Sequence, residues 1–188
     1  MEQALSAEGS VAMTASARAK ALYVVGMMAN YQGDHLAADP LVQEGLRLCK
    51  ELEDRVGTAY ALSNAGYVAL GRGRYQQAIT VIEEAADLFL EEGEKWGAAI
   101  ELGFLAVAWR NQGDYERAKQ LAERALAISR EIGERQASTS ALYTLALLAR
   151  TEGKDERARK MFEEGLRLSA ELGNEADVAH CLEGLASM

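Results

Sequence analysis

The feature that most constrains this chain is a repeat of forty residues. Gly33, Gly73, Gly113 and Gly153 are evenly spaced, and their surroundings, YQGDH, GRGRY, NQGDY and TEGKD, are similar each time. A period of this length is typical of a solenoid, whose units cannot bury their apolar faces alone and must stack. The repeat therefore predicts an elongated array with a core that forms between neighbouring units.

Each unit has the pattern of two helices. Apolar residues recur at spacings of three and four before the glycine, as at Leu102 and Leu105, and again after it, as at Ala118 and Ala122. Such spacings place side chains on one face of a helix. The glycine is expected to end the first helix in the left-handed conformation. The first helices are predicted over residues 15–31, 55–71, 95–111 and 135–151, and the second helices over 34–51, 74–91, 114–131 and 154–171.

We expect a single array with repeats at 15–54, 55–94, 95–134 and 135–174. Residues 1–14 are predicted to form a partial helix and a loop, and residues 175–188 a first helix that lacks its second helix. Both ends suggest a segment excised from a longer array. Val178, Leu182 and Leu185 lie at helical spacing with no partner helix after them. These uncovered ends predict either association of copies into a homo-oligomer or fraying of the last helix.

Composition argues against several classes of function. The chain has 29 acidic and 20 basic residues, a net charge of −9, so direct binding to nucleic acid phosphates is not expected. The sequence has neither an apolar stretch of membrane-spanning length nor the pattern of a signal peptide. Cys49 and Cys181 stand apart within helical patterns, which favours small core residues of a reduced protein. We expect a cytoplasmic protein with no metal, cofactor or membrane contact.

Catalysis has little support in the sequence. His35 and His180 lie in different repeats, and Cys181, next to His180, projects about a hundred degrees away from it on a helix. Glutamate pairs such as Glu83 and Glu84 fall on second helices, whose outer face is usually solvated, and not in an apolar pocket that raises a carboxyl pKa. No phosphate-binding loop of the form G-x-x-x-x-G-K-S/T is present. We expect no catalytic residue and no enzymatic activity.

The repeated pattern resembles the tetratricopeptide repeat. It reads Leu-x2-Leu/Ala-Gly/Ala-x2-aromatic/Ala, then Gly-x-Tyr at Tyr75 and Tyr115, then Ala-x3-apolar-x2-Ala. His35 and Asp155 depart from the aromatic residue of that turn. HEAT and armadillo repeats have periods nearer forty, but their pattern of Ala and Gly fits less well. The resemblance covers essentially the whole chain and implies an all-α, right-handed superhelical solenoid of about four full repeats with partial repeats at both ends.

A narrower resemblance concerns the phrases between the units, KELEDR, EEGEKW, REIGER and AELGNE. They are similar to the sensor arrays of MalT-like or LuxR-type ATP-binding bacterial regulators. This resemblance implies a non-enzymatic sensor or protein-binding module that acts in signal transduction and transcription regulation and is excised from a larger protein. The alternative is a stand-alone structural or self-association scaffold, or adaptor.

In tetratricopeptide arrays the first helices line a concave face that binds a protein, a peptide or a small effector. The equivalent positions in this chain predict a binding surface that contains Tyr23, Met27, Asn30, Tyr60, Tyr67, Arg110, Asn111, Tyr143 and Arg150. Aromatic residues would supply apolar contacts, and an Arg would pair with a carboxylate. The alternative is that the tyrosines pack between repeats and that the arginines are solvated.

Overall fold

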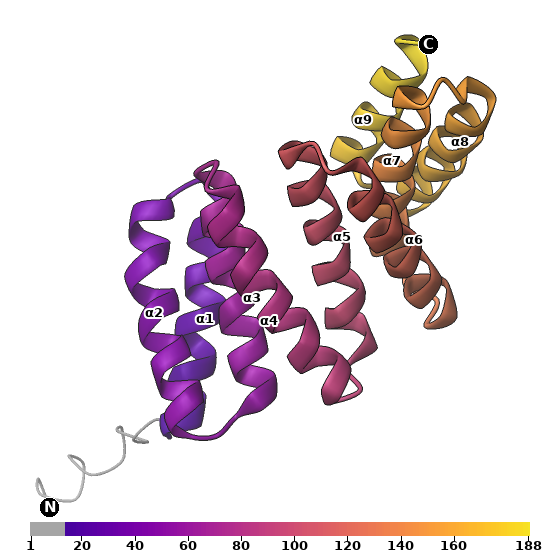
Figure 1. The fold of residues 1–188 in the computed structure, drawn as a ribbon. Coiled ribbons are helices and arrows are strands. Elements are labelled where there is room, and N and C mark those ends of the chain that lie inside the picture. Colours follow the sequence, from indigo (N-terminus) through magenta and orange to yellow (C-terminus); the bar gives the residue numbers. More distant parts are fainter. Residues whose placement is uncertain (1–13) are drawn as a thin grey trace, which may run out of the picture.

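The computed structural model describes residues 14–188, which form helices joined by short turns, with no strand in that range (Figure 1). The helices are α1 (Ala15–Tyr31), α2 (His35–Glu51), α3 (Arg55–Gly71), α4 (Tyr75–Glu91), α5 (Lys95–Gln112), α6 (Tyr115–Glu131), α7 (Arg135–Thr151), α8 (Asp155–Leu172) and α9 (Glu175–Ala186). The eight helices predicted for the four full repeats are present, with bounds that differ by one residue or less, and the last helix, expected over 175–188, ends at Ala186. The partial helix expected over residues 1–14 falls outside the described part, apart from Thr14, which caps α1.

The turns are built as the repeat predicts. Gly113 follows α5 with φ 87° and occupies the left-handed region, where a side chain is disfavoured. Asp114 then caps α6 by accepting a hydrogen bond from the backbone N–H of Arg117 at 3.0 Å. The turn after α2 differs from the equivalent turns after α4, α6 and α8, because its left-handed residue is Glu53, with φ 55°, where the others have glycine. The neighbouring Asp54 caps α3 instead.

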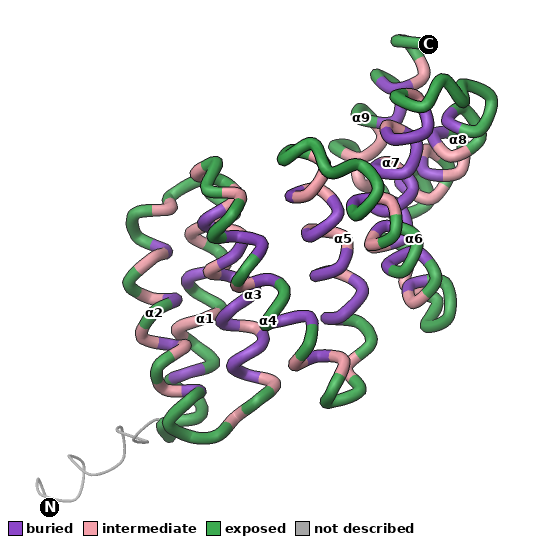
Figure 2. The backbone as a smooth tube through the Cα atoms, in the orientation of Figure 1, coloured by how far each residue is buried: buried purple, intermediate pink, exposed green. Residues whose placement is uncertain are grey.

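The helices form an all-α solenoid, as predicted. Each odd-numbered helix packs on the even-numbered helix that follows it and also contacts the next odd-numbered helix. No two even-numbered helices approach each other as closely, so the odd-numbered helices lie on the concave side of the array. Buried residues concentrate on the helix faces that meet inside and between pairs (Figure 2).

We call the contact between successive helix pairs a joint. The first joint lies between α1–α2 and α3–α4, the second between α3–α4 and α5–α6, and the third between α5–α6 and α7–α8. Apolar side chains pack at all of them; Leu102, Leu142 and Leu145 belong to one buried cluster around the third joint. Polar side chains distinguish the joints from one another.

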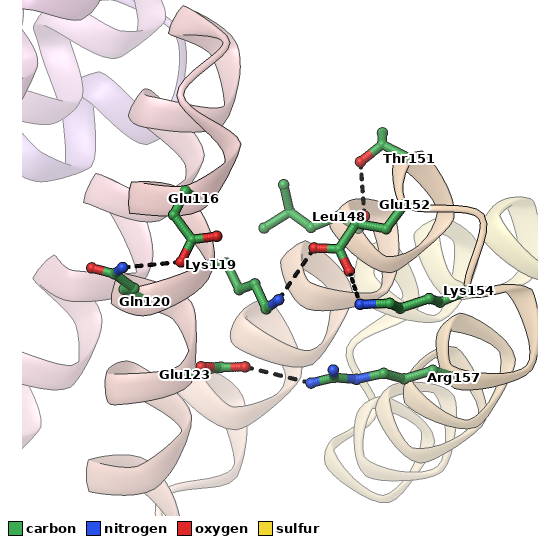
Figure 3. Close-up of polar contacts among 9 residues, drawn as sticks. All are labelled: Glu116, Lys119, Gln120, Glu123, Leu148, Thr151, Glu152, Lys154 and Arg157. Carbon is green, nitrogen blue, oxygen red and sulfur yellow. Dashed lines mark hydrogen bonds and ion pairs between the residues drawn. The ribbon is translucent and has the colours of Figure 1, made fainter.

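Ion pairs cross the outer part of the third joint (Figure 3). Lys119 on α6 lies 3.2 Å from the carboxylate of Glu152, which also pairs with Lys154 at 2.6 Å. Arg157 on α8 reaches Glu123 at 3.4 Å. The first joint carries comparable pairs, including Arg72 with Asp39 at 3.0 Å and Lys50 with Glu84 at 3.5 Å.

Candidate binding surface

A row of aromatic rings crosses the first two joints. Tyr23 on α1 stacks on Tyr60 of α3, with ring centroids 5.8 Å apart and planes inclined by 14°. The Tyr60 ring also meets Phe89 edge-on at 4.9 Å and Trp96 of α5 at 6.5 Å. The structure therefore brings two of the predicted tyrosines together, packed between repeats.

The other predicted tyrosines lie in two separate places. Tyr67 of α3 packs against Phe104 of α5, with centroids 4.2 Å apart. Tyr143 of α7 lies near Phe162 at 5.9 Å and near His180 of α9 at 5.5 Å. The four predicted tyrosines therefore lie in three separate places along the array and do not share one site.

The concave side holds a pocket of about 250 Å³, which we call the concave pocket. Its walls come only from the odd-numbered helices and the turn before α7: Tyr31 at the end of α1, Trp96, Ile100 and Phe104 on α5, and Gln136 on α7 are among its residues. Tyr31 and Trp96 are 74% and 44% exposed, so aromatic surface is open to a partner there. Sequence reasoning did not single out Tyr31, Trp96 or Phe104, because the pocket depends on how α1 and α5 face each other across the array.

A second, larger pocket of about 660 Å³ lies where α5 and α7 end, and we call it the arginine pocket. Arg110, Asn111 and Arg150 all line it, so these three predicted residues are brought together. The Nη1 atom of Arg110 is buried without a hydrogen-bond partner, and its Nη2 reaches only the Oδ1 atom of Asn111 at 3.4 Å. Arg150 donates hydrogen bonds to the side-chain and backbone oxygens of Ser187, at 2.7 and 3.2 Å.

The remaining predicted residues line neither of these two pockets. Met27 is partly buried on α1. The Oδ1 atom of Asn30 lies 2.6 Å from Nδ1 of His35, so its side chain joins α1 to the start of α2. Tyr67 also lies outside both pockets, although its neighbour Phe104 lines the concave pocket.

The most unusual polar residue behind this surface is Glu101, which the sequence reasoning missed. It is 2% exposed on α5, and its Oε1 atom accepts hydrogen bonds from Ser63 at 2.7 Å and from Tyr67 at 2.6 Å. Its Oε2 atom is buried and has no partner. The repeat contained a signal for it, because the positions forty residues before and after are Ala61 and Ala141.

The buried cluster shifts the pKa values of its groups. Burial raises the pKa of Glu101 from 4.5 to about 7, although the hydrogen bonds from Tyr67 and Ser63 act in the opposite direction. Burial, followed by the nearby charge of Glu101, raises the pKa of Tyr67 well above its usual range. A carboxyl group with such a pKa changes its charge near neutral pH.

Within residues 14–188 no three His, Cys, Asp or Glu side chains gather as a metal ion would require. None of the helices described is long and apolar enough to cross a membrane.

Comparison with known proteins addresses the fold and the family. No curated protein matches this sequence. Among solved structures, aspartyl phosphate phosphatase F from Bacillus subtilis is 16% identical, with a TM-score of 0.80 over 89% of this chain and 44% of that one. The apo form of RapI is 18% identical, with a TM-score of 0.80 over 98% of this chain and 66% of that one.

A third similar structure is the signal transduction ATPase with numerous domains and a tetratricopeptide repeat sensor from Pyrococcus horikoshii. It is 10% identical, with a TM-score of 0.77 over 93% of this chain and 27% of that one. This chain thus spans less than two thirds of each of these three proteins. The tetratricopeptide repeat model matches residues 17–91 and 98–171. The chain therefore belongs to the tetratricopeptide repeat family.

Proposed function

We propose that this chain is a non-enzymatic binding module whose concave pocket receives apolar side chains of a protein or peptide. The observation that carries the proposal is the exposed aromatic surface of Tyr31 and Trp96 in a pocket formed by α1, α5 and α7. Large aromatic residues in a concave site are the side chains that most often dominate binding energy. Repeats of this family generally serve as scaffolds for protein interactions, which supports the same reading.

The arginine pocket supplies a second contact in this proposal. Arg110 takes part in no ion pair among the described residues, and Arg150 has only neutral oxygen partners. The two guanidinium groups outnumber the one acidic side chain of the pocket, Asp155, and therefore favour an anionic group, such as a carboxylate of the same partner. Tyr23, Tyr60, Tyr67 and Tyr143 then act by setting the angles between repeats, and Met27 and Asn30 by shaping the α1 end of the surface.

The wider role that we propose is a cytoplasmic sensor segment of a larger signalling protein. The similar ATPase from Pyrococcus horikoshii carries a tetratricopeptide repeat sensor, and this chain covers a minor share of its length. The phrases between repeats point to the same class of regulator, in which the array would detect a partner and other domains would respond.

A second candidate function is self-association, and a specific observation favours it. Val25 and Met28 on α1 are 50% and 54% exposed, whereas their equivalents one repeat later, Ala65 and Val68, are partly buried and buried. At the other end, Leu182 of α9 is exposed while Val178 and Leu185 are partly buried. Sedimentation of the wild type at several concentrations separates the two candidates, because a scaffold of this kind assembles without any other partner.

A random peptide library of about 12 residues, selected on the purified chain, tests the binding module. We expect selected peptides to carry aromatic or large aliphatic residues together with an acidic one. Trp96→Ala should weaken them by about 1 kcal/mol or more, roughly fivefold. Leu172→Ala, which removes an exposed apolar side chain at the end of α8, is the matched control and should bind as the wild type does. Peptides that bind the Trp96→Ala variant equally well would place the site elsewhere.

A further inference from the structure

Glu101 breaks the internal repeat at a buried position. The equivalent residues of the second and fourth repeats, Ala61 and Ala141, are 0% and 1% exposed. A small apolar residue therefore fills this position elsewhere in the array. A buried carboxyl group costs free energy unless it is neutral or fully hydrogen-bonded. Because the carboxyl group occurs in the third repeat and not in its neighbours, its role must lie in the contacts of that repeat.

The residues that donate hydrogen bonds to Glu101 are also not repeated at the equivalent positions of the next repeat. Ser63 and Tyr67 lie on α3, in the repeat before Glu101, and both donate to the same oxygen atom. One repeat later, the positions of Ser63 and Tyr67 hold Gly103 and Val107, which have no hydroxyl to donate. The three side chains thus form a connection that the third joint does not repeat.

This connection is the sole polar link across the second joint in the described part of the chain, apart from the hydrogen bonds that cap α5. The sixteen ion pairs within residues 14–188 include none that joins α3 or α4 to α5 or α6. Apolar packing, in a buried cluster that includes Ile79 of α4 and Leu105 of α5, supplies the rest of the contact. The angle of this joint therefore depends on apolar contacts and on one carboxyl group.

The link is also incomplete. The Oε2 atom of Glu101 is buried without a partner, which leaves an unsatisfied acceptor when the group is charged and an unsatisfied donor when it carries a proton on that atom. The titratable groups that face the cluster are tyrosines, Tyr67 and Tyr60 on α3 and Tyr31 at the end of α1. Glu101 forms no ion pair with a Lys or Arg of the described helices, so no cation offsets its charge.

The concave pocket spans this same joint. Tyr31 lies on the side of the first two repeats, and Trp96, Phe104 and Gln136 lie on the side of the third and fourth. The Phe104 ring packs directly on Tyr67, whose hydroxyl holds Glu101. A change in the angle of the second joint must therefore change the distance between the two walls of the pocket.

We propose that Ser63, Tyr67 and Glu101 form a latch that closes the second joint and thereby sets the width of the concave pocket. With a proton on Glu101, the neutral carboxyl stays buried and the joint is closed. When the proton leaves, the uncompensated charge favours an open joint, in which water reaches Oε2. The role of the latch in controlling partner binding rests on the proposed function, whereas the motion of the joint does not.

The direction of the pH dependence follows from the raised pKa of Glu101 in the closed form, about 7 against an ordinary 4.5. The closed form binds a proton that the open form releases, so closure is favoured at low pH and lost as pH rises through about 7. For one proton, the ratio of open to closed forms increases by up to about tenfold per pH unit between about pH 4.5 and pH 7.

Pairs of nitroxide labels measure the joint without any ligand. Asp87, Ala127 and Arg167 are exposed and occupy equivalent positions on α4, α6 and α8. Cysteines at 87 and 127 report on the second joint, and cysteines at 127 and 167 report on the third joint as the matched control. The buried Cys49 and Cys181 are replaced by Ala in all variants. A third pair, Gln32→Cys with Gln136→Cys, spans the mouth of the concave pocket.

We expect distances between 87 and 127 and between 32 and 136 to shift together from pH 5 to pH 8, and the 127–167 distance to stay constant. Glu101→Gln, which keeps an acceptor but cannot ionise, should hold the closed distances at every pH. Tyr67→Phe removes a hydrogen bond that lowers the Glu101 pKa, so the midpoint of the shift should move to higher pH. A purely structural role of Tyr67 would not move that midpoint.

Three results would overturn the latch. The first is a wild type whose 87–127 distance does not change with pH, and the second is a Glu101→Gln variant that changes as the wild type does. The third is a second joint that moves while the 32–136 distance stays fixed, because the latch then does not control the pocket. None of these measurements needs a partner, so failure to find a binding peptide would count against the proposed function and not against the latch.

Discussion

The second and third joints of this array are built from the same repeat but held by different forces. At the third joint, ion pairs such as Lys119–Glu152 and Arg157–Glu123 cross the outer surface (Figure 3). At the second joint, the polar link is the buried carboxyl of Glu101 on the concave side. Both joints also have an apolar core.

This difference shows that the joints of a repeat protein can be held by different interactions although the repeats share one pattern. Surface ion pairs contribute little to stability and are screened by salt, so the third joint owes its rigidity mainly to apolar packing. A buried carboxyl with an unpartnered oxygen is costly, and its cost depends on its proton. The second joint is therefore the one whose geometry responds to conditions while its neighbours stay unchanged.

The largest expected effect comes from truncating one buried side chain at each joint to Ala. Leu142→Ala leaves a cavity in the third joint and should lower the free energy of unfolding by about 2–5 kcal/mol. Glu101→Ala should change it by less than about 1 kcal/mol at pH 8, because lost contacts are offset by removal of an uncompensated charge. Urea unfolding measures both, and similar losses for the two variants would contradict the comparison.

The next effect concerns pH. The folded chain keeps a proton on Glu101 that the unfolded chain loses above about pH 4.5, so the free energy of unfolding should fall as pH rises from there to about 7. At about 1.4 kcal/mol per pKa unit, this amounts to about 3 kcal/mol at most, and less if the joint opens. Urea unfolding at each pH gives the free energy of unfolding of the wild type and of Glu101→Gln. The contributions of the other carboxyl groups cancel in the difference between these two values. A constant difference would mean that the burial of Glu101 is incomplete.

The smallest effect belongs to the third joint. The pKa of the Glu152 carboxyl is held below its usual value by hydrogen bonds from Lys154 and then from Lys119. Lys119→Ala should therefore raise that pKa part of the way back, with little change in the urea midpoint, because the carboxyl is exposed. Carbon-detected NMR titration of the side chain gives the pKa. A large loss of stability in this variant would show that the ion pairs, and not the apolar core, hold the third joint.

Sequence reasoning predicted the helices well because their signals are local. Backbone hydrogen bonds in a helix join residues four apart, and its apolar face recurs within the same range. The left-handed glycines and the capping by Asp34 and Asp114 follow from the same short range. Glu53 was missed because a non-glycine residue at positive φ breaks the rule on which the prediction depends.

The candidate site was predicted only in part. Arg110, Asn111 and Arg150 do meet in one pocket, since a forty-residue spacing places equivalent positions side by side in adjacent repeats. Tyr31 and Phe104 were not expected to share the concave pocket, because α1 and α5 are two repeats apart and their approach depends on the angles of two joints. Those angles depend on how side chains of neighbouring repeats pack, and the forty-residue pattern of the sequence does not predict that packing.

The sequence by itself determined that this chain is a stack of helix pairs from the tetratricopeptide family, because period, turn glycines and apolar spacing all act over short distances. Only the tertiary structure decided what lies on the concave side and which joint differs. The sequence places Glu101 where the adjacent repeats have Ala, but only the fold shows that α3 covers it and brings the hydroxyls of Ser63 and Tyr67 to one of its oxygens. Burial is a property of the assembled array, and burial is what turns an ordinary glutamate into a group that titrates near neutral pH.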